Sequence, residues 1–264
     1  MDINHISVSR RDCWESCKQK YKYRYHLKVE LDEPEKFHFT YGKIVHKIAE
    51  TYVEHRGSYP LNELVQDVLK GDIEIEENKV APELPREYKE KLPRHIKAFK
   101  KLTDQIGTDG ICEYKFEYDL EPPNNYLVTG FIDRLINKNG KFFIIDYKTT
   151  KRGKWRKTPQ TIVHDLQLRC YGRVVQKAFN VPADKIMAAL YYFEGEEIVS
   201  TRFTEKSLEE AEKELLRAYK EIKDFPPEKA WGTTGDHCNL CDYKKICPFY
   251  NKKVHTLSSH PLLT

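Results

Sequence analysis

The sequence lacks any long hydrophobic run. Its longest, IMAALYYF at residues 186–193, is far shorter than the roughly 20 apolar residues that span a bilayer. Charged side chains are frequent among the first 25 residues, which argues against a secretory signal. The chain also lacks a G-x-x-x-x-G-K-[ST] phosphate-binding loop and internal repeats. We therefore expect a soluble, cytoplasmic protein with no membrane partner and no nucleotide-driven motor.

Charge of one sign is not in large excess either. The 45 lysines and arginines nearly balance 41 aspartates and glutamates, which gives a net charge of +4. The fold as a whole is therefore no polycation, and local basic clusters matter more than the total. With 264 residues the chain is long enough to bury a substantial core. We expect one domain over residues 1–264.

Apolar spacing and turn residues predict an α/β domain. A helical subregion is expected at about 40–105 and a sheet at about 111–204. Helices are predicted at residues 8–26, 42–56, 61–70, 86–105, 164–179 and 205–224, and strands at 111–120, 126–138, 141–150, 186–194 and 197–204. Ser7 and Ser9 are both candidate caps of the first helix. Pro85 and Pro93 are expected to break or bend the helices near them.

Two aspartates flank a predicted hairpin. Asn139-Gly140 is a strong signal for a tight turn, with Asp133 on the strand before it and Asp146 on the strand after it. Pairing of the two strands brings both carboxylates close enough to share one divalent cation, and oxygen ligands suit Mg²⁺ or Mn²⁺. Strand periodicity points Lys148 to the same face as Asp146. Such a lysine can orient an attacking water or offset charge on a phosphate.

A basic stretch follows immediately. Residues 148–157 hold six lysines and arginines, no acid and one tryptophan, Trp155. Phosphate neutralisation combined with base stacking on aromatic rings is how proteins bind single-stranded nucleic acid. We expect this stretch, with Lys151 and Arg152, to contact DNA. For the similar KQKYKYRY stretch at 18–25, packing and nucleic-acid binding remain equally open.

Four short segments together resemble the RecB-like branch of the PD-(D/E)XK nuclease superfamily: GKIVHK at 42–47, GFIDRL at 130–135, IIDYKT at 144–149 and QLRCYG at 167–172. The resemblance implies a restriction-endonuclease-like mixed central sheet flanked by helices, with an N-terminal helical region. It also implies a site. His46, Asp133, Asp146 and the Tyr147 carbonyl would hold Mg²⁺ or Mn²⁺, Lys148 would be the catalytic lysine, and Gln167 with Tyr171 would position DNA. Glu113, on the preceding strand, could also face the site, but we interpret it as a solvated strand carboxylate.

The cysteines form a second pattern. Their number, seven, and the absence of an export signal argue against a disulfide framework, and the C-x2-C-x5-C spacing at 238–247 is typical of metal ligation. One early and three late cysteines resemble the 4Fe–4S ligands of AddB-type and CRISPR-adaptation nucleases. The resemblance implies a structural cluster held by Cys17, Cys238, Cys241 and Cys247, with a C-terminal cluster segment at about 232–250. Cys13 remains an alternative to Cys17, and zinc is the rival occupant. Cys112 and Cys170 are interpreted as small hydrophobic residues.

These observations predict a metal-dependent deoxyribonuclease, an exonuclease on single-stranded DNA or DNA ends. The alternative is a catalytically weak DNA-binding or end-processing subunit of a recombination, repair or CRISPR-adaptation complex. Cleavage of DNA in the presence of Mn²⁺ distinguishes the two.

Overall fold

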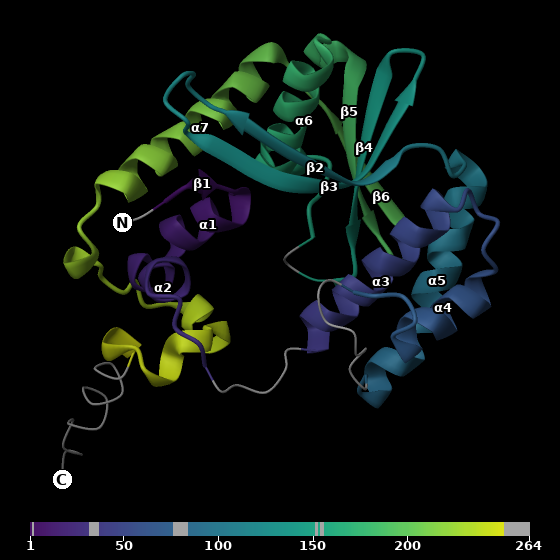
Figure 1. Ribbon diagram of the computed structural model, residues 1–264, viewed down its shortest axis with the longest axis horizontal. Helices are drawn as coiled ribbons and strands as arrows, with labels where there is room; N and C mark the ends of the chain where they lie inside the picture. Colours follow the sequence, from purple (N-terminus) through teal and green to yellow (C-terminus); the bar gives the residue numbers. More distant parts are fainter. Residues whose placement is uncertain (2, 32–36, 76–83, 151–152, 154–155, 251–264) are drawn as a thin grey trace. The chain divides into compact units, whose positions relative to one another are not determined.

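The computed structural model describes residues 1, 3–31, 37–75, 84–150, 153 and 156–250 (Figure 1). The predicted DNA contacts Lys151 and Arg152, and Trp155 between them and the next strand, lie outside the described residues. Within the described part of the chain, no helix combines the length and apolar character needed to cross a membrane.

The chain divides into two compact units, which we describe separately. The first comprises Met1–Pro34, Glu117–Gly130 and Glu212–Thr264, and the second Glu35–Phe116 and Phe131–Ala211. Both units therefore combine segments that are distant in the sequence.

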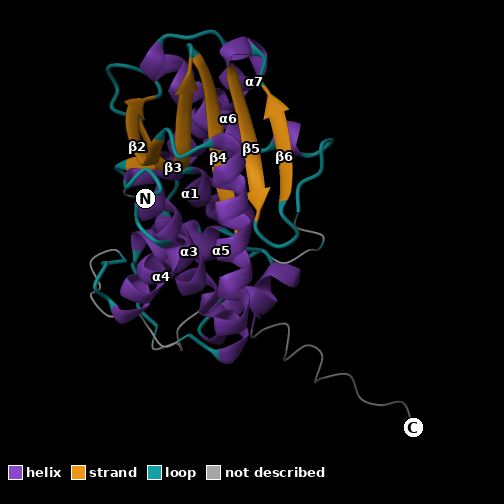
Figure 2. Cartoon of the chain, turned by 90° about the vertical axis from the view of Figure 1, so that its right-hand side faces the viewer, coloured by secondary structure: helices purple, strands orange, loops and turns teal. Residues whose placement is uncertain are grey.

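A mixed sheet is the central element. Its strands are β1 (His5–Ile6), β2 (Ile111–Asp119), β3 (Leu127–Lys138), β4 (Lys141–Lys148), β5 (Ile186–Tyr192) and β6 (Glu197–Arg202). Their order is β1-β3-β4-β5-β6, with β2 also paired to β3. Figure 2 shows β3 to β6 side by side. The β3–β4 and β5–β6 pairs are antiparallel, whereas β4 and β5 are parallel. This arrangement confirms the predicted α/β fold with a mixed central sheet flanked by helices.

The predicted hairpin joins β3 to β4. Asn139 and Gly140 both have positive φ, 52° and 74°, as a type I′ turn requires. The register pairs Lys138 with Lys141 and Arg134 with Ile145. Asp133 and Asp146 lie directly beyond this last pair.

Three helices of the second unit pack on one face of the sheet. They are α3 (Phe37–Glu54), α4 (Leu61–Lys70) and α5 (Arg86–Ile106), and α3 contacts both others (Figure 1). Their core includes Ile145 and Tyr147 of β4. Because neighbours along a strand point to opposite faces, Asp146 faces the other side. α5 begins directly after Pro85 and continues through Pro93. The helix is therefore not broken at Pro93.

The other face of the sheet carries α6 (Leu166–Phe179), which contacts β4 and β5. Asp165 caps its N-terminus by accepting a hydrogen bond from the Leu168 N–H. Gly172 permits close packing here, because a Cβ on this residue would lie 2.9 Å from side-chain atoms of both Leu208 and Phe203. Leu208 lies near the start of α7 (Glu205–Asp224).

The first unit begins with helical turns instead of the single helix predicted at 8–26. They are α1 (Val8–Ser16), α2 (Lys18–Tyr21) and a π-helical turn (Lys22–His26). The break falls at Cys17, whose backbone is extended, and the Ser7 side chain caps α1. Short 3-10 turns at Asp236–Leu240 and Asp242–Lys245 form the C-terminal cysteine segment.

Candidate functional site

Asp133, Asp146 and Lys148 lie on one face of the β3–β4 hairpin. Asp133 and Asp146 adjoin Arg134 and Ile145, the last pair of the β3–β4 register, and Lys148 follows Asp146 by one full strand period. The Lys148 Nζ atom lies 2.6 Å from the Asp146 Oδ2 atom, and the Asp146 side chain is only 2% exposed. The three predicted residues are therefore brought together.

His46 from α3 and Glu113 from β2 join this group. The His46 Nδ1 atom lies 3.6 Å from Asp133 Oδ2 and 4.0 Å from Glu113 Oε1. One potential ligand atom from each of these three residues lies within 4.8 Å of the other two. The interpretation of Glu113 as a solvated strand carboxylate is wrong, because its side chain faces His46 and is only 33% exposed. Its φ of 44° departs from extended strand geometry, so alternation along β2 does not predict its direction.

The backbone of Tyr147 holds two members of the group. Its N–H donates a hydrogen bond to Asp133 Oδ2 at 2.6 Å. Its carbonyl, predicted to be a metal ligand, accepts a hydrogen bond from His46 Nε2 at 3.1 Å. A carbonyl can only accept, so Nε2 carries the proton, and neutral His46 presents the Nδ1 lone pair to Asp133 and Glu113.

Burial and mutual repulsion oppose ionisation of these acids. Burial, and next the charge of Asp146, raise the pKa of Asp133 well above its ordinary value. Burial, with Asp133 as the second cause, raises the pKa of Glu113 to about 7. Burial lowers the pKa of His46 and so favours the neutral imidazole. A divalent cation would relieve the repulsion between the carboxylates and leave the imidazole free to bind it.

A hydrogen-bonded chain supports Lys148 from the helix side. The Lys148 ammonium donates to Gln167 Oε1 at 3.2 Å, and the Gln167 amide donates to the Tyr171 hydroxyl at 2.8 Å. Burial opposes charge on Lys148, but the neighbouring Asp146 outweighs it and the pKa of Lys148 is raised. Lys148 is therefore a cation at neutral pH. Tyr171 is buried, and Gln167 links it to Lys148. A contact of Gln167 or Tyr171 with DNA stays a prediction.

The donor set fits Mg²⁺ or Mn²⁺. Carboxylate oxygens are the preferred ligands of both ions, and one imidazole nitrogen among them is accepted more readily by Mn²⁺. His46, Glu113 and Asp133 offer such a set. No sulfur atom belongs to this group, so it differs from the thiolate-rich sites that bind soft metals.

The four cysteines of the second pattern lie in the first unit. Cys17, Cys238, Cys241 and Cys247 line one small pocket, and Cys13 does not. The Gln19 N–H donates to the Trp231 carbonyl at 2.9 Å and ties α2 to the C-terminal segment. Among the described residues, no three cysteine sulfurs lie within 4.8 Å of one another. Burial raises the pKa of Cys13 to about 11, which disfavours its thiolate.

One aromatic side chain near the acids escaped the sequence prediction. Phe131 precedes Asp133 by two residues on β3, so the two side chains share a face. Phe131 is 49% exposed, which is unusual for phenylalanine in the interior of a sheet. The sequence could have indicated this position of Phe131, because a spacing of two residues from Asp133 places both side chains on one face of a strand.

Three comparisons with known proteins bear on the family to which the chain belongs. No curated protein matches the sequence. A protein from Eubacterium rectale named a "Putative exonuclease" has a similar structure, with a TM-score of 0.54 and 14% identity over 91% of this chain and 88% of that one. The structure of SSO0001 is similar at a TM-score of 0.43 and 14% identity, covering 94% and 88% of the two chains. The family model described as "PD-(D/E)XK nuclease superfamily" matches residues 5–248. With nearly its whole length inside that match, the chain belongs to the PD-(D/E)XK nuclease superfamily.

Proposed function

We propose that the protein is a metal-dependent deoxyribonuclease that acts as an exonuclease on single-stranded DNA or DNA ends. One observation carries the proposal. The ligand atoms of His46, Glu113 and Asp133 lie within 4.8 Å of one another, and the charges of the paired Asp146 and Lys148 act on Asp133. Nuclease activity is the chemistry of the superfamily, whereas the choice of DNA and of its ends is our inference.

His46, Asp133, Asp146 and Glu113 would hold the cation. A bound Mg²⁺ or Mn²⁺ supplies Lewis-acid polarisation of the phosphate and lowers the pKa of a coordinated water. We retain the Tyr147 carbonyl as a predicted ligand. It can take that role if the bond from His46 Nε2 is exchanged, because the two groups already lie 3.1 Å apart.

Lys148 supplies the fixed positive charge of the site. Its raised pKa keeps it protonated, so it stabilises negative charge on the phosphate and is not a general base in this arrangement. Asp146 and Gln167 hold its amine at 2.6 and 3.2 Å. Gln167 and Tyr171 would therefore position DNA through Lys148 as well as by direct contact.

The flanking basic stretch would hold the DNA backbone. Lys151 and Arg152 remain predicted contacts. Arg156, next to them in sequence, lies over the Tyr192 ring at 4.4 Å and donates to Glu197, which anchors the end of the stretch beside β5. Repair, recombination and CRISPR adaptation are the processes in which such an end-directed enzyme is used.

The decisive test compares end-labelled and circular single-stranded DNA with Mn²⁺. We expect wild-type protein to shorten the labelled strands and to leave the circle intact. Lys148→Ala should lower the rate by about 10²-fold or more, since it removes a preorganised charge. Lys141→Ala, at the exposed far end of the same strand, is the matched control. Equal cleavage by Lys148→Ala and wild type would remove Lys148 from the reaction, and cutting of the circle would exclude strict exonuclease action.

We also propose that the cysteine pocket holds a structural 4Fe–4S cluster. All four predicted ligands line one pocket. Burial raises the pKa of Cys241, so metal binding there has to displace the thiol proton. The same four thiolates could hold a single zinc ion, so the bound metal distinguishes the two occupants.

Anaerobic purification tests the cluster. We expect iron, sulfide and broad visible absorption in wild-type protein, and loss of all three in Cys17→Ser and Cys241→Ser. Cys13→Ser should retain them, because Cys13 does not line the pocket. Stoichiometric zinc without iron would decide for the rival occupant.

A further inference from the structure

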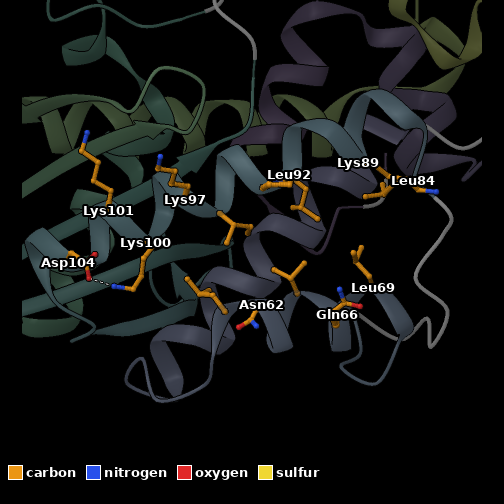
Figure 3. A pocket seen from close by; sticks show the side chains of 14 residues that line it. Asn62, Gln66, Leu69, Leu84, Lys89, Leu92, Lys97, Lys100, Lys101 and Asp104 are labelled. Atoms are coloured by element: carbon orange, nitrogen blue, oxygen red, sulfur yellow. Dashed lines mark hydrogen bonds and ion pairs between the residues drawn. The ribbon is translucent and has the colours of Figure 1, made fainter.

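A large groove lies between α4 and α5 (Figure 3). Its volume is about 1100 Å³, and none of its lining residues belongs to the candidate active site. Half of the lining side chains are aliphatic, and they are Leu61, Val65, Leu69, Leu84, Leu92, Pro93 and Ile96. The four segments that resemble the nuclease family and the proposed catalytic residues all lie outside this groove. They therefore assign it no function.

The apolar floor follows from the spacing on α4. Leu64 and Val68 are fully buried against the core of the second unit. Leu61, Val65 and Leu69 form a second stripe with a spacing of four residues, and this stripe is only half-buried. The apolar surface of α4 is therefore wider than the core covers, and a wide exposed apolar stripe marks a contact surface.

The two sides of the groove differ in charge. Lys97, Lys100 and Lys101 extend along the α5 side, whereas the amides Asn62 and Gln66 lie on the α4 side (Figure 3). Asp104 is the one acid among the lining residues that the structure describes. It pairs with Lys100, and Lys101 pairs with Glu196. These are exposed pairs that contribute little to stability, so a partner's carboxylates can replace them.

We propose that this groove binds an acidic amphipathic helix of a partner protein. Apolar side chains on one face of the helix would enter the floor, and its glutamates or aspartates would face the α5 lysines. From Lys89 to Asp104, α5 offers about 22 Å, which matches a helix of about 15 residues. Nucleic acid is disfavoured because the described lining residues include no aromatic ring for stacking and no arginine.

Fluorescence anisotropy with a designed peptide tests the proposal. The probe is a 15-residue helix with leucines at i, i+4, i+7 and i+11 and glutamates along one flank. One control peptide has the same composition with the leucines distributed around the helix, and another has lysine in place of glutamate. We expect the first peptide to bind at least about 10-fold more tightly than either control, since both the apolar face and the charge contribute. Equal affinities would overturn the proposal.

Three variants locate the binding. Val65→Glu and Lys97→Glu should each weaken binding by about 10-fold or more, and Lys97→Glu should prefer the lysine peptide. The exposed Lys206→Glu, on α7, should change nothing. Because these residues lie outside the candidate active site, Mn²⁺-dependent cleavage should persist, which also verifies folding and separates this test from that of the proposed function. Unchanged affinity in both groove variants would refute the site.

Two further results would assign the groove to other occupants and would overturn the proposal. Displacement of the peptide by a single-stranded oligonucleotide would give the surface to DNA. Conversion of a self-associated wild-type protein to a monomer by Val65→Glu, measured by sedimentation, would give it to a second copy of this chain.

Discussion

Replacing Glu113 by glutamine should stabilise the metal-free protein at alkaline pH and should lower its affinity for Mn²⁺. Glu113 lies beside Asp133 and His46, and its pKa is raised from 4.5 to about 7, by burial first and by Asp133 second. A carboxyl with a raised pKa in the folded state contributes stability below its ordinary pKa. That contribution is lost as the pH rises from 4.5 through about 7. At pH 8 the folded protein therefore carries an unfavourable charge that glutamine removes.

The size of the effect follows from the same displacement. A pKa raised from 4.5 to about 7 corresponds to an upper bound of about 3 kcal/mol in the free energy of unfolding. One third of the Glu113 side chain is exposed, so solvent screening reduces this to about 1–2 kcal/mol at pH 8. At pH 5, where the carboxyl of the folded state is still protonated, Glu113→Gln should stabilise the protein much less than at pH 8.

Urea unfolding of chelator-treated protein, followed by circular dichroism at pH 5 and pH 8, measures the difference. Glu117→Gln, an exposed glutamate on the same strand, is the matched control. Added Mn²⁺ should reverse the order at pH 8, because a ligand that binds only the folded state stabilises it in proportion to its affinity. The reasoning fails if the variant gains nothing at pH 8, gains as much at pH 5, or responds to Mn²⁺ like wild type.

Further predictions concern the neighbourhood of the site. Arg134 is fully buried and donates to the carbonyls of Gly107 and Asp109, so Arg134→Met should lower the free energy of unfolding by about 3 kcal/mol, measured by urea titration, and a loss below about 1 kcal/mol would contradict this. Phe131→Ala should weaken binding of single-stranded DNA in the presence of Ca²⁺ by about 5-fold or more through lost stacking. Phe131→Trp should restore the affinity, and a matching loss from Ile111→Ala, at the exposed start of β2, would indicate a general surface effect instead.

The hairpin and its three polar residues could be predicted because they depend on local rules. Asn139-Gly140 fixes the turn, the turn fixes the register, and the two-residue period then fixes the face of Asp133, Asp146 and Lys148. The helix predicted at 61–70 also agrees with α4, because its apolar spacing is regular. Long-range packing alters none of these relationships.

Glu113 could not be assigned correctly for the opposite reason. Its side-chain direction depends on one backbone angle, φ of 44°, that interrupts strand alternation and that no neighbouring glycine or turn motif announces. Its proximity to His46 further depends on how β2 and α3 meet, which involves residues far apart in the chain. The groove was missed for the same reason, since each helix is amphipathic by itself and only the arrangement of α4 and α5 leaves a stripe uncovered.

Gln167 and Tyr171 show what periodicity can and cannot supply. A spacing of four residues places them on one side of α6, and the hydrogen bond between them confirms that. Periodicity does not say what that side faces. Here Tyr171 is buried and Gln167 accepts a hydrogen bond from Lys148, so their first effect is on the lysine. A Gln167→Ala variant would then disturb the position of a charge as well as any contact with DNA, and a change in the Mn²⁺-dependent rate larger than the change in DNA affinity would separate the two effects.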